Sequence, residues 1–245
     1  MLTGTASADD FLAHAATMTS FDTEAVELPE ADVFQAMFET HIGGRERSLP
    51  PGLHPTAVPT FVAQVWRCPD SPWGEFALAQ ARVGSRSGLR PRGHIQGCVC
   101  DNERAVEGLR TRWGFPARLG AVELRRHYDA VEAVAGTDGH TALSLRGVDP
   151  EPLDPDDPQY SGSVALAHTP RGLRLVQIEY DVAVTRAERV RPHLDAFDAA
   201  ALGVHPAVDP YYPVSASIAT GTITLHRLRF VSRPDELAFT GTEPV

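Results

Sequence analysis

Short segments rich in β-branched and aromatic residues, separated by turns that contain proline or glycine, constrain the fold of this chain more than any other feature. Residues 60–67 (TFVAQVWR) are the first clear example and follow a rigid turn at residues 49–55. Residues 75–83 and 94–100 come next and are joined across the glycine-bounded stretch 84–93. The pattern predicts a hairpin and a fold dominated by strands.

One segment has a helical pattern instead. Asp101 and Asn102 supply an N-cap, and Glu103 lies in the first turn, where the helix dipole favours a carboxylate. Apolar residues then recur at helical spacing, and Gly114 and Pro116 follow them: Ala105, Val106, Leu109 and Trp113. The pattern predicts a helix over residues 101–113.

The remaining elements complete an α+β pattern. Residues 29–40 and 123–134 fit a helix or a strand equally well. Residues 186–202 are rich in alanine and are expected to be helical apart from Pro192, and residues 149–158 form an acidic, proline-rich loop. Further strands are expected at residues 141–146, 163–168, 173–184 and 218–231, the third pairing back across the turn at residues 170–172. We expect one domain, residues 1–245, with an N-terminal arm at residues 1–25.

Charge and cysteine content narrow the classes of partner and compartment. The formal net charge is −10, and the arginines are scattered rather than gathered in a stripe, so the electrostatic footprint of a nucleic-acid-binding protein is missing. The first 18 residues lack a basic region followed by a long apolar one, and no run of about 18 apolar residues occurs that could span a membrane. The 3 cysteines are too few for a disulfide framework. We therefore expect a cytoplasmic protein that binds neither nucleic acid nor membranes.

Common catalytic motifs are missing from the sequence. It contains no glycine-rich phosphate loop, no Gly-x-Ser-x-Gly and no His-Glu-x-x-His. This argues against nucleotide-dependent enzymes, serine hydrolases of that class and zincin metalloproteases.

The order of several stretches resembles the acetoacetate decarboxylase superfamily. The strongest is residues 101–103 (DNE), running through the predicted helix into residues 113–120 (WGFPARLG), which is similar to the family's aromatic-Pro-Lys-Lys-Leu-Gly signature. Other similar stretches fall in the same order: residues 34–40, 49–53, 73–76 and 164–184. The resemblance implies a curled, mainly antiparallel sheet, cone-like or barrel-like, around a cavity with flanking helices. We also expect a homo-oligomer that acts on a small-molecule substrate.

The departures from this family concern its catalytic groups. The family uses a Schiff-base lysine activated by a neighbouring cation, but all 22 cationic side chains of this chain are arginine. The family's lysine pair falls on Ala117 and Arg118, and its catalytic glutamate falls on Leu78. A second glutamate falls near Ala63 or Gln64, and the pocket arginine falls on residue 31, an alanine. Because arginine stays protonated, imine chemistry at this position is excluded.

Three residues are predicted to take catalytic roles: Glu75, His94 and Arg118. Glu75 lies close to the missing glutamate, and Arg118 is positioned to hold a carboxylate or enolate oxygen at two points. Each also has a purely structural interpretation: Glu75 as an ion-paired carboxylate, His94 as a buried histidine, and Arg118 as the partner of a carboxylate in an ion pair. In an extended strand His94 would share one face with Gln96, Cys98 and Cys100.

The predicted substrate-binding residues surround these positions: Gln64, Phe76, Leu78, Gln96, Cys98, Trp113, Phe115 and Ala117. A zinc site from His94, Cys98 and Cys100 has suitable ligand types, but same-face residues on a strand lie roughly 6–7 Å apart, which is too far without a bulge. We therefore expect no metal and no cofactor, with the cysteines packing as small apolar groups.

Two functions remain open from the sequence. The first is a non-Schiff-base enzyme that catalyses an acid–base step, such as cyclisation, dehydration or isomerisation, on a keto-acid or polyketide-like carbonyl substrate. The second is a catalytically silent small-molecule-binding protein on the same fold. Both rest on the resemblance, because a fold does not by itself fix a function.

Overall fold

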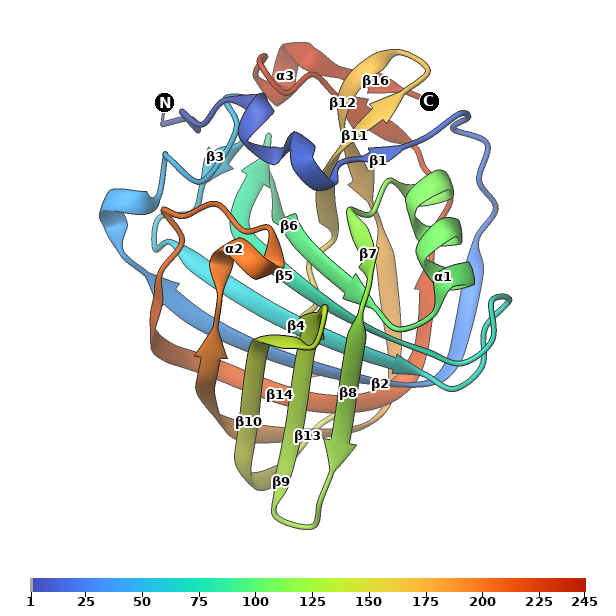
Figure 1. Ribbon diagram of the computed structural model, residues 1–245, viewed down its shortest axis with the longest axis vertical. Helices are drawn as coiled ribbons and strands as arrows, with labels where there is room; N and C mark the ends of the chain where they lie inside the picture. The colour runs from blue at the N-terminus through green and yellow to red at the C-terminus, as the bar shows by residue number, and fades with distance from the viewer. Residues whose placement is uncertain (1) are drawn as a thin grey trace.

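A single long sheet organises the chain in the computed structural model, which describes residues 2–245 (Figure 1). Its strands follow the order β16-β15-β12-β11-β6-β5-β4-β2-β14-β13-β10-β9-β8. Neighbouring strands are antiparallel except where β11 meets β6 and where the short strands β1 and β7 join β11 and β6. The sheet is thus mainly antiparallel, as the resemblance implies.

The sheet curls until β8 packs against β4, β5 and β6, without closing into a barrel (Figure 1). The strands that build this curl are β2 (Val26–Thr40), β4 (Thr60–Cys68), β5 (Phe76–Ser87), β6 (Arg90–Cys100), β8 (Ala121–Arg126), β9 (Ala130–Thr137), β10 (His140–Leu153), β13 (Tyr180–Phe197) and β14 (Pro210–Leu225). The remaining strands are β1 (Ala16–Thr17), β3 (His54–Pro55), β7 (Ala117–Leu119), β11 (Ser163–Thr169), β12 (Gly172–Ile178), β15 (Phe230–Ser232) and β16 (Thr242–Pro244).

The helices are short and lie around the curled sheet (Figure 1). They are η1 (Ala8–His14), η2 (Ile42–Gly44), α1 (Glu103–Gly108), η3 (Leu109–Trp113), α2 (Ala199–Leu202) and α3 (Ala238–Gly241). No helix within residues 2–245 is long and apolar enough to cross a membrane.

Strand β4 is buried on both sides, and it shows how the two apolar cores are divided between the faces of the sheet. Phe61, Ala63 and Val65 point to one side, and Gln64 and Trp66 point to the other, because successive residues of a strand alternate. We call these sides the Phe61 face and the Trp66 face. The Phe61 face packs against β8, β9 and β10, whereas the Trp66 face packs against η3 and the start of β13.

Most of the predicted elements are confirmed. Residues 60–67 lie in a strand, and the hairpin of β5 and β6 turns at Gly88, much more tightly than the predicted stretch 84–93. The predicted strand 218–231 is interrupted, because β14 ends at Leu225 and β15 begins at Phe230. The predicted loop 149–158 begins only after Leu153, where β10 ends. The helix over residues 103–113 forms with Asn102 as its N-cap, accepting hydrogen bonds from two backbone amides, and its second half is a π-helical turn. The two undecided segments are strands: residues 29–40 lie in β2, and residues 123–134 span β8 and β9.

The prediction of a helix over residues 186–202 is wrong. Strand β13 continues to Phe197, and only residues 199–202 are helical. Alanine content favours a helix in isolation, but β13 is paired on both sides, with β14 and β10. Strand pairing therefore overrides local propensity. The predicted strand 173–184 is likewise divided at Glu179, where β12 ends and β13 begins.

Candidate functional site

A row of side chains crosses the Trp66 face through five strands. Gln35 on β2 pairs with Gln64 on β4, which pairs with Gln80 on β5. Gln80 pairs in turn with Cys98 on β6, and Cys98 pairs with Ala117 on β7. We call these five residues the polar row. Directly paired residues point to the same side of a sheet. The row therefore runs along one face, from its three glutamines to Ala117, the residue onto which the resemblance maps the family's lysine.

Gln64 is the centre of a buried hydrogen-bond network. Its amide nitrogen donates to Gln35 Oε1 (3.0 Å), and its Oε1 accepts from Arg82 Nη1 (3.0 Å) and from the Tyr180 hydroxyl (3.0 Å). Arg82 Nη1 also donates to the Tyr180 oxygen (2.8 Å). Arg82 is 1% exposed and Tyr180 is 4% exposed. A tyrosine hydroxyl is therefore fixed between a permanent cation and an amide carbonyl, away from solvent.

Gln80 differs from its neighbours in the row. It is fully buried, yet neither atom of its amide has a hydrogen-bond partner among the described residues. A buried amide without partners costs roughly 1–3 kcal/mol, so structures retain one mainly where it serves another purpose. Its donor and acceptor are therefore unengaged on the Trp66 face.

A cavity of about 330 Å³ opens at the Arg82 end of this network. Gln35 and Thr60 line it from the sheet, and Tyr160 and Ser161 line it from the loop between β10 and β11. Arg82 is part of its wall. The volume is within the lower range of small-molecule sites.

The residues onto which the sequence resemblance maps the family's catalytic groups come together on the same face. Ala117, Leu78 and Ala31 all belong to the apolar cluster of the Trp66 face, and each is at most 1% exposed. Trp66 packs among them, with its ring 6.4 Å from that of Phe115 and at a T-shaped angle. Where the resemblance predicts an amine, a carboxylate and a guanidinium, this chain has three apolar side chains.

The predicted substrate-binding residues fall largely into this cluster. Phe76, Leu78, Cys98, Trp113, Phe115 and Ala117 belong to it, and Gln64 lies on the same face. Trp113 donates its indole N–H to the His226 carbonyl (2.9 Å). Burial raises the pKa of the Cys98 thiol well above its ordinary value, so this cysteine stays a neutral thiol.

The expectation that His94, Gln96, Cys98 and Cys100 share one face is wrong. A bulge shifts the β5–β6 register between Ala81 and Arg82, so His94 pairs with Val83 on the Phe61 face. Cys98 and Cys100 remain on the Trp66 face. The zinc site considered from the sequence therefore does not form, and no group of three or more His, Cys, Asp or Glu side chains in residues 2–245 is arranged to hold a metal ion.

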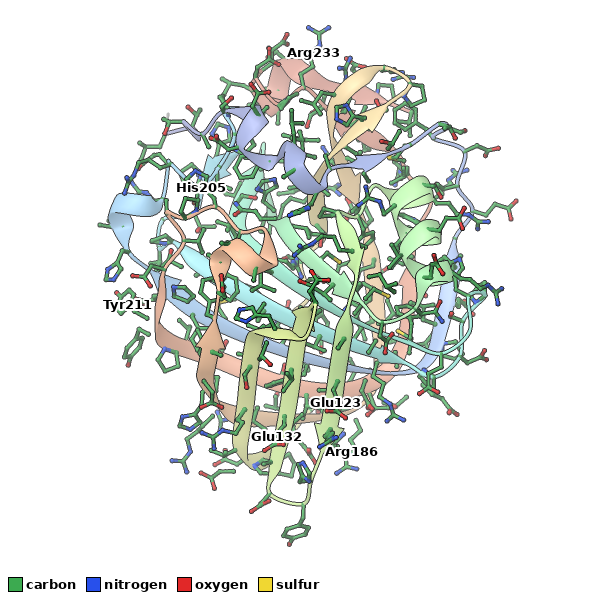
Figure 2. The ribbon with its side chains drawn as sticks, viewed as in Figure 1. Glu123, Glu132, Arg186, His205, Tyr211 and Arg233 are labelled. Carbon is green, nitrogen blue, oxygen red and sulfur yellow. The ribbon has the colours of Figure 1, made fainter. Side chains whose placement is uncertain are left out.

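His94 and Gln96 have structural partners on the Phe61 side. The His94 ring lies edge-on to Phe11 at 5.0 Å, and Gln96 Nε2 lies 3.3 Å from His94 Nδ1. Gln96 also donates to the Ser48 carbonyl (2.6 Å) and accepts from the backbone N–H of His205 (2.9 Å), which follows α2 (Figure 2). Burial lowers the pKa of His94 to about 3, so the ring is neutral near pH 7.

Neither the Glu75 side chain nor the Arg118 side chain is part of the polar row. The Glu75 side chain is 66% exposed just before β5, 3.9 Å from Arg67. Arg118 follows Ala117 on β7 and pairs with Val99, so its side chain leaves the Trp66 face and donates to the Ala201 carbonyl of α2 (2.5 Å). The structure therefore places the three predicted catalytic residues in three separate surroundings.

Sequence reasoning missed the buried partners of Gln64. Within residues 76–83 (FALAQARV), alternation already places Gln80 and Arg82 on the face of Phe76 and Leu78. A glutamine and an arginine in such an apolar strand are a detectable signal, because buried polar groups need partners. Tyr180 has no comparable local signal, since the curl of the sheet brings β13 to β4.

Proteins similar to this chain are found only among solved structures. No protein-family model and no curated protein matches the sequence. Acetoacetate decarboxylase from Legionella pneumophila superposes with a TM-score of 0.70 at 19% identity, over 89% of this chain and 88% of that one. A second acetoacetate decarboxylase structure has a TM-score of 0.74 at 16% identity and covers 98% of both chains. The enduracididine biosynthesis enzyme MppR, complexed with pyruvate, has a TM-score of 0.68 at 18% identity, over 85% of this chain and 91% of that one. The chain therefore has the acetoacetate decarboxylase-like fold.

Proposed function

We propose that the chain is an enzyme that carries out an acid–base step on a small keto-acid-like carbonyl compound without forming an imine. The polar row carries this proposal. It keeps hydrogen-bonding amides on the Trp66 face, and it ends at Ala117, where the resemblance places the family's lysine and this chain has no amine. MppR, which shares the fold, forms complexes with pyruvate and with a condensation product of pyruvate and imidazole 4-carboxaldehyde. These ligands support a carbonyl compound as the substrate class.

The proposed roles follow from the hydrogen-bonding capacity of each group. The Gln80 amide N–H would donate to a substrate carbonyl oxygen and so stabilise the negative charge that develops on it as an enolate forms. The Tyr180 hydroxyl would give its proton to the substrate carbonyl oxygen, and the phenolate so formed, which keeps its hydrogen bond from Arg82, would take up the proton that the neighbouring carbon loses. Cyclisation, dehydration and isomerisation next to a carbonyl all use these two roles, the stabilisation of charge on the carbonyl oxygen and the transfer of a proton.

Conversion of Tyr180 to phenylalanine tests this proposal. Wild type should convert at least one substrate from a panel of acetoacetate, pyruvate, and pyruvate together with an aldehyde. NMR spectroscopy of the reaction mixture would identify the product and measure the rate. Tyr180→Phe should lower that rate by about 10²- to 10⁴-fold, the usual contribution of one positioned acid or base. Tyr211→Phe is the matched control, because Tyr211 lies at the outer edge of the molecule and bonds to Glu39 (Figure 2).

Two results would contradict the proposal. Full turnover by Tyr180→Phe would remove this hydroxyl from the chemistry. Thermal stabilisation by panel compounds with no product from any of them would instead favour a silent binding protein on the same fold.

A further inference from the structure

The groups assigned to the proposed chemistry are closed off from solvent. Tyr180 is 4% exposed and Gln80 is fully buried. The cavity of about 330 Å³ has Arg82 in its wall, and Arg82 donates to the Tyr180 oxygen (2.8 Å), but neither Tyr180 nor Gln80 lines the cavity. A small molecule in the cavity therefore reaches these groups only if a part of the protein moves.

Most of the cover over these groups is firmly attached. Strands β4, β5 and β6 pair with one another along their lengths. In η3, Trp113 is fully buried and donates to the His226 carbonyl (2.9 Å), and Arg110 donates to three backbone carbonyls. The contrast is the segment between β10 and β11, residues 154–162, which contains no helix or strand. We call it the β10–β11 loop.

The first half of the β10–β11 loop bonds mainly to itself. The backbone N–H groups of Asp156 and Asp157 donate to the side chain and to the carbonyl of Asp154, both at 3.0 Å. All three residues are exposed. At the other end, the Gly93 N–H donates to the Gly162 carbonyl (3.0 Å), the one backbone hydrogen bond that joins this loop to the sheet in residues 2–245. A segment with so few backbone bonds to its surroundings opens more easily than the rest of the fold.

Two side chains hold the second half of this loop against the sheet. Gln35 Nε2 donates to the Gln159 carbonyl (3.2 Å). Arg82 Nη2 donates to the carbonyl (2.7 Å) and the hydroxyl (3.2 Å) of Ser161, and to the Gly162 carbonyl (3.2 Å). The loop is therefore latched by side chains, and most of the latch is a single guanidinium.

Arg82 and the loop satisfy each other's polar groups. Arg82 is 1% exposed and forms no ion pair with a carboxylate of residues 2–245, so its burial depends on neutral acceptors such as the loop carbonyls. In return, the loop carbonyls accept hydrogen bonds from a charged donor, which are stronger than neutral ones. The Gly93 backbone packs against the same side chain, where a Cβ would be 2.2 Å from Nε. Because Gly93 belongs to a paired strand, the loop is the part of these surroundings that is able to move.

We propose that the β10–β11 loop is a lid, held closed by Arg82, whose opening connects the cavity with Tyr180. Tyr160 and Ser161 line the cavity from the lid, so its movement widens the space next to the guanidinium. Once Ser161 is withdrawn, Arg82 is free to turn towards water and uncover the Tyr180 hydroxyl. That a substrate needs this path rests on the proposed function, whereas the opening itself is measurable without any substrate.

Cleavage of the full-length protein by chymotrypsin after Tyr160 reports the opening. The protease must take up the tyrosine ring and an extended stretch of chain, and in the closed state this ring lines the cavity. Mass spectrometry of the early products measures the rate at which fragment 1–160 appears. Phe61 is fully buried in β4, so a cut after Phe61 reports global unfolding instead. We expect wild type to be cut after Tyr160 before any cut after Phe61.

Loosening the lid and removing its latch should each raise this rate. Pro158→Gly leaves Arg82 and Tyr180 unchanged but gives the loop more conformational freedom, and it should speed the cut after Tyr160 about two- to fivefold. Arg82→Met leaves the loop carbonyls without their charged donor and should speed it at least about tenfold. Pro170→Gly is the matched control, because it makes the same change in the turn between β11 and β12, and its rate should equal that of wild type.

Nitration by tetranitromethane tests whether the opening leads to Tyr180. The reagent must reach the phenol ring, and peptide mapping by mass spectrometry locates each nitrated tyrosine. Pro158→Gly should raise nitration of Tyr180 by the same factor as the cut after Tyr160, because both events require the open lid. Pro170→Gly should leave both rates at the wild-type value.

Three results would overturn the lid: cutting after Tyr160 no faster than after Phe61, a wild-type rate in Pro158→Gly or Arg82→Met, or faster cutting without faster nitration of Tyr180. If Arg82→Met fails to fold, Pro158→Gly decides. Lid opening without turnover of any panel compound would contradict the proposed enzyme and leave the lid standing. Turnover by a protein whose loop does not open would do the reverse.

Discussion

Replacing Ala117 with lysine is expected to lower the free energy of unfolding by roughly 3–5 kcal/mol at pH 7, the cost of an uncompensated buried charge. Ala117 is 1% exposed and belongs to the cluster that contains Trp66 and Phe115. No acetone should be released from acetoacetate, because Leu78 lies where the resemblance places the family's glutamate. Chemical unfolding with urea and an acetone assay measure the two effects.

The pH dependence of this variant has a definite sign. The introduced amine titrates near 10.4 in the unfolded chain, and burial lowers its pKa in the folded protein. Between the two values the unfolded state binds more protons, so stability rises with pH. The deficit relative to Ala117→Met, a control of similar length without charge, should therefore shrink between neutral pH and about pH 10. Substantial acetone release, or equal stability of the two variants at pH 7, would show that the pocket still accepts an amine.

His94 should make the protein sensitive to acid. Burial lowers its pKa to about 3 in the folded protein, from an ordinary value of 6.5. Between these values the unfolded chain is protonated and the folded protein is not, so stability falls as the pH falls from 6.5 towards 3. One such group costs at most about 1.4 kcal/mol for each pH unit within this window.

The variants His94→Leu and His94→Gln remove this titration. Leucine is suited to the contact with Phe11, and glutamine keeps a hydrogen-bonding partner for Gln96. Both should show a shallower loss of stability than wild type in urea unfolding between pH 6.5 and 4, about one proton less per molecule. Identical slopes in wild type and both variants would mean that His94 is already accessible to protons in the folded state.

Local sequence patterns were sufficient for most strands and for the one substantial helix. Residues 60–67 are rich in β-branched and aromatic residues, and Asn102 has the side chain that a helix N-cap requires. Residues 186–202 were not predictable in this way, because their conformation is decided by pairing with two strands distant in the sequence. Periodicity within a segment cannot report such partners.

The candidate site was predictable only in part, for a related reason. The resemblance identified Gln64, Leu78 and Ala117 as neighbours, and the structure places them on one face. A single bulge in β6 moved His94 and Gln96 to the opposite face, and one extra residue in a strand is not visible in its apolar pattern. The contact between Tyr180 and Gln64 joins residues 116 positions apart. It depends on the curl of the whole sheet.

The most direct test of imine-free chemistry is borohydride reduction followed by intact-mass measurement. The protein would be saturated with a keto acid that it is shown to bind and turn over, and a lysine-dependent decarboxylase would be treated in parallel. We predict that the mass and the turnover of this protein are unchanged, while the decarboxylase gains a reduced adduct and loses activity. A stoichiometric adduct that abolishes turnover would show that an amine of this chain, despite the absence of lysine, forms the imine after all.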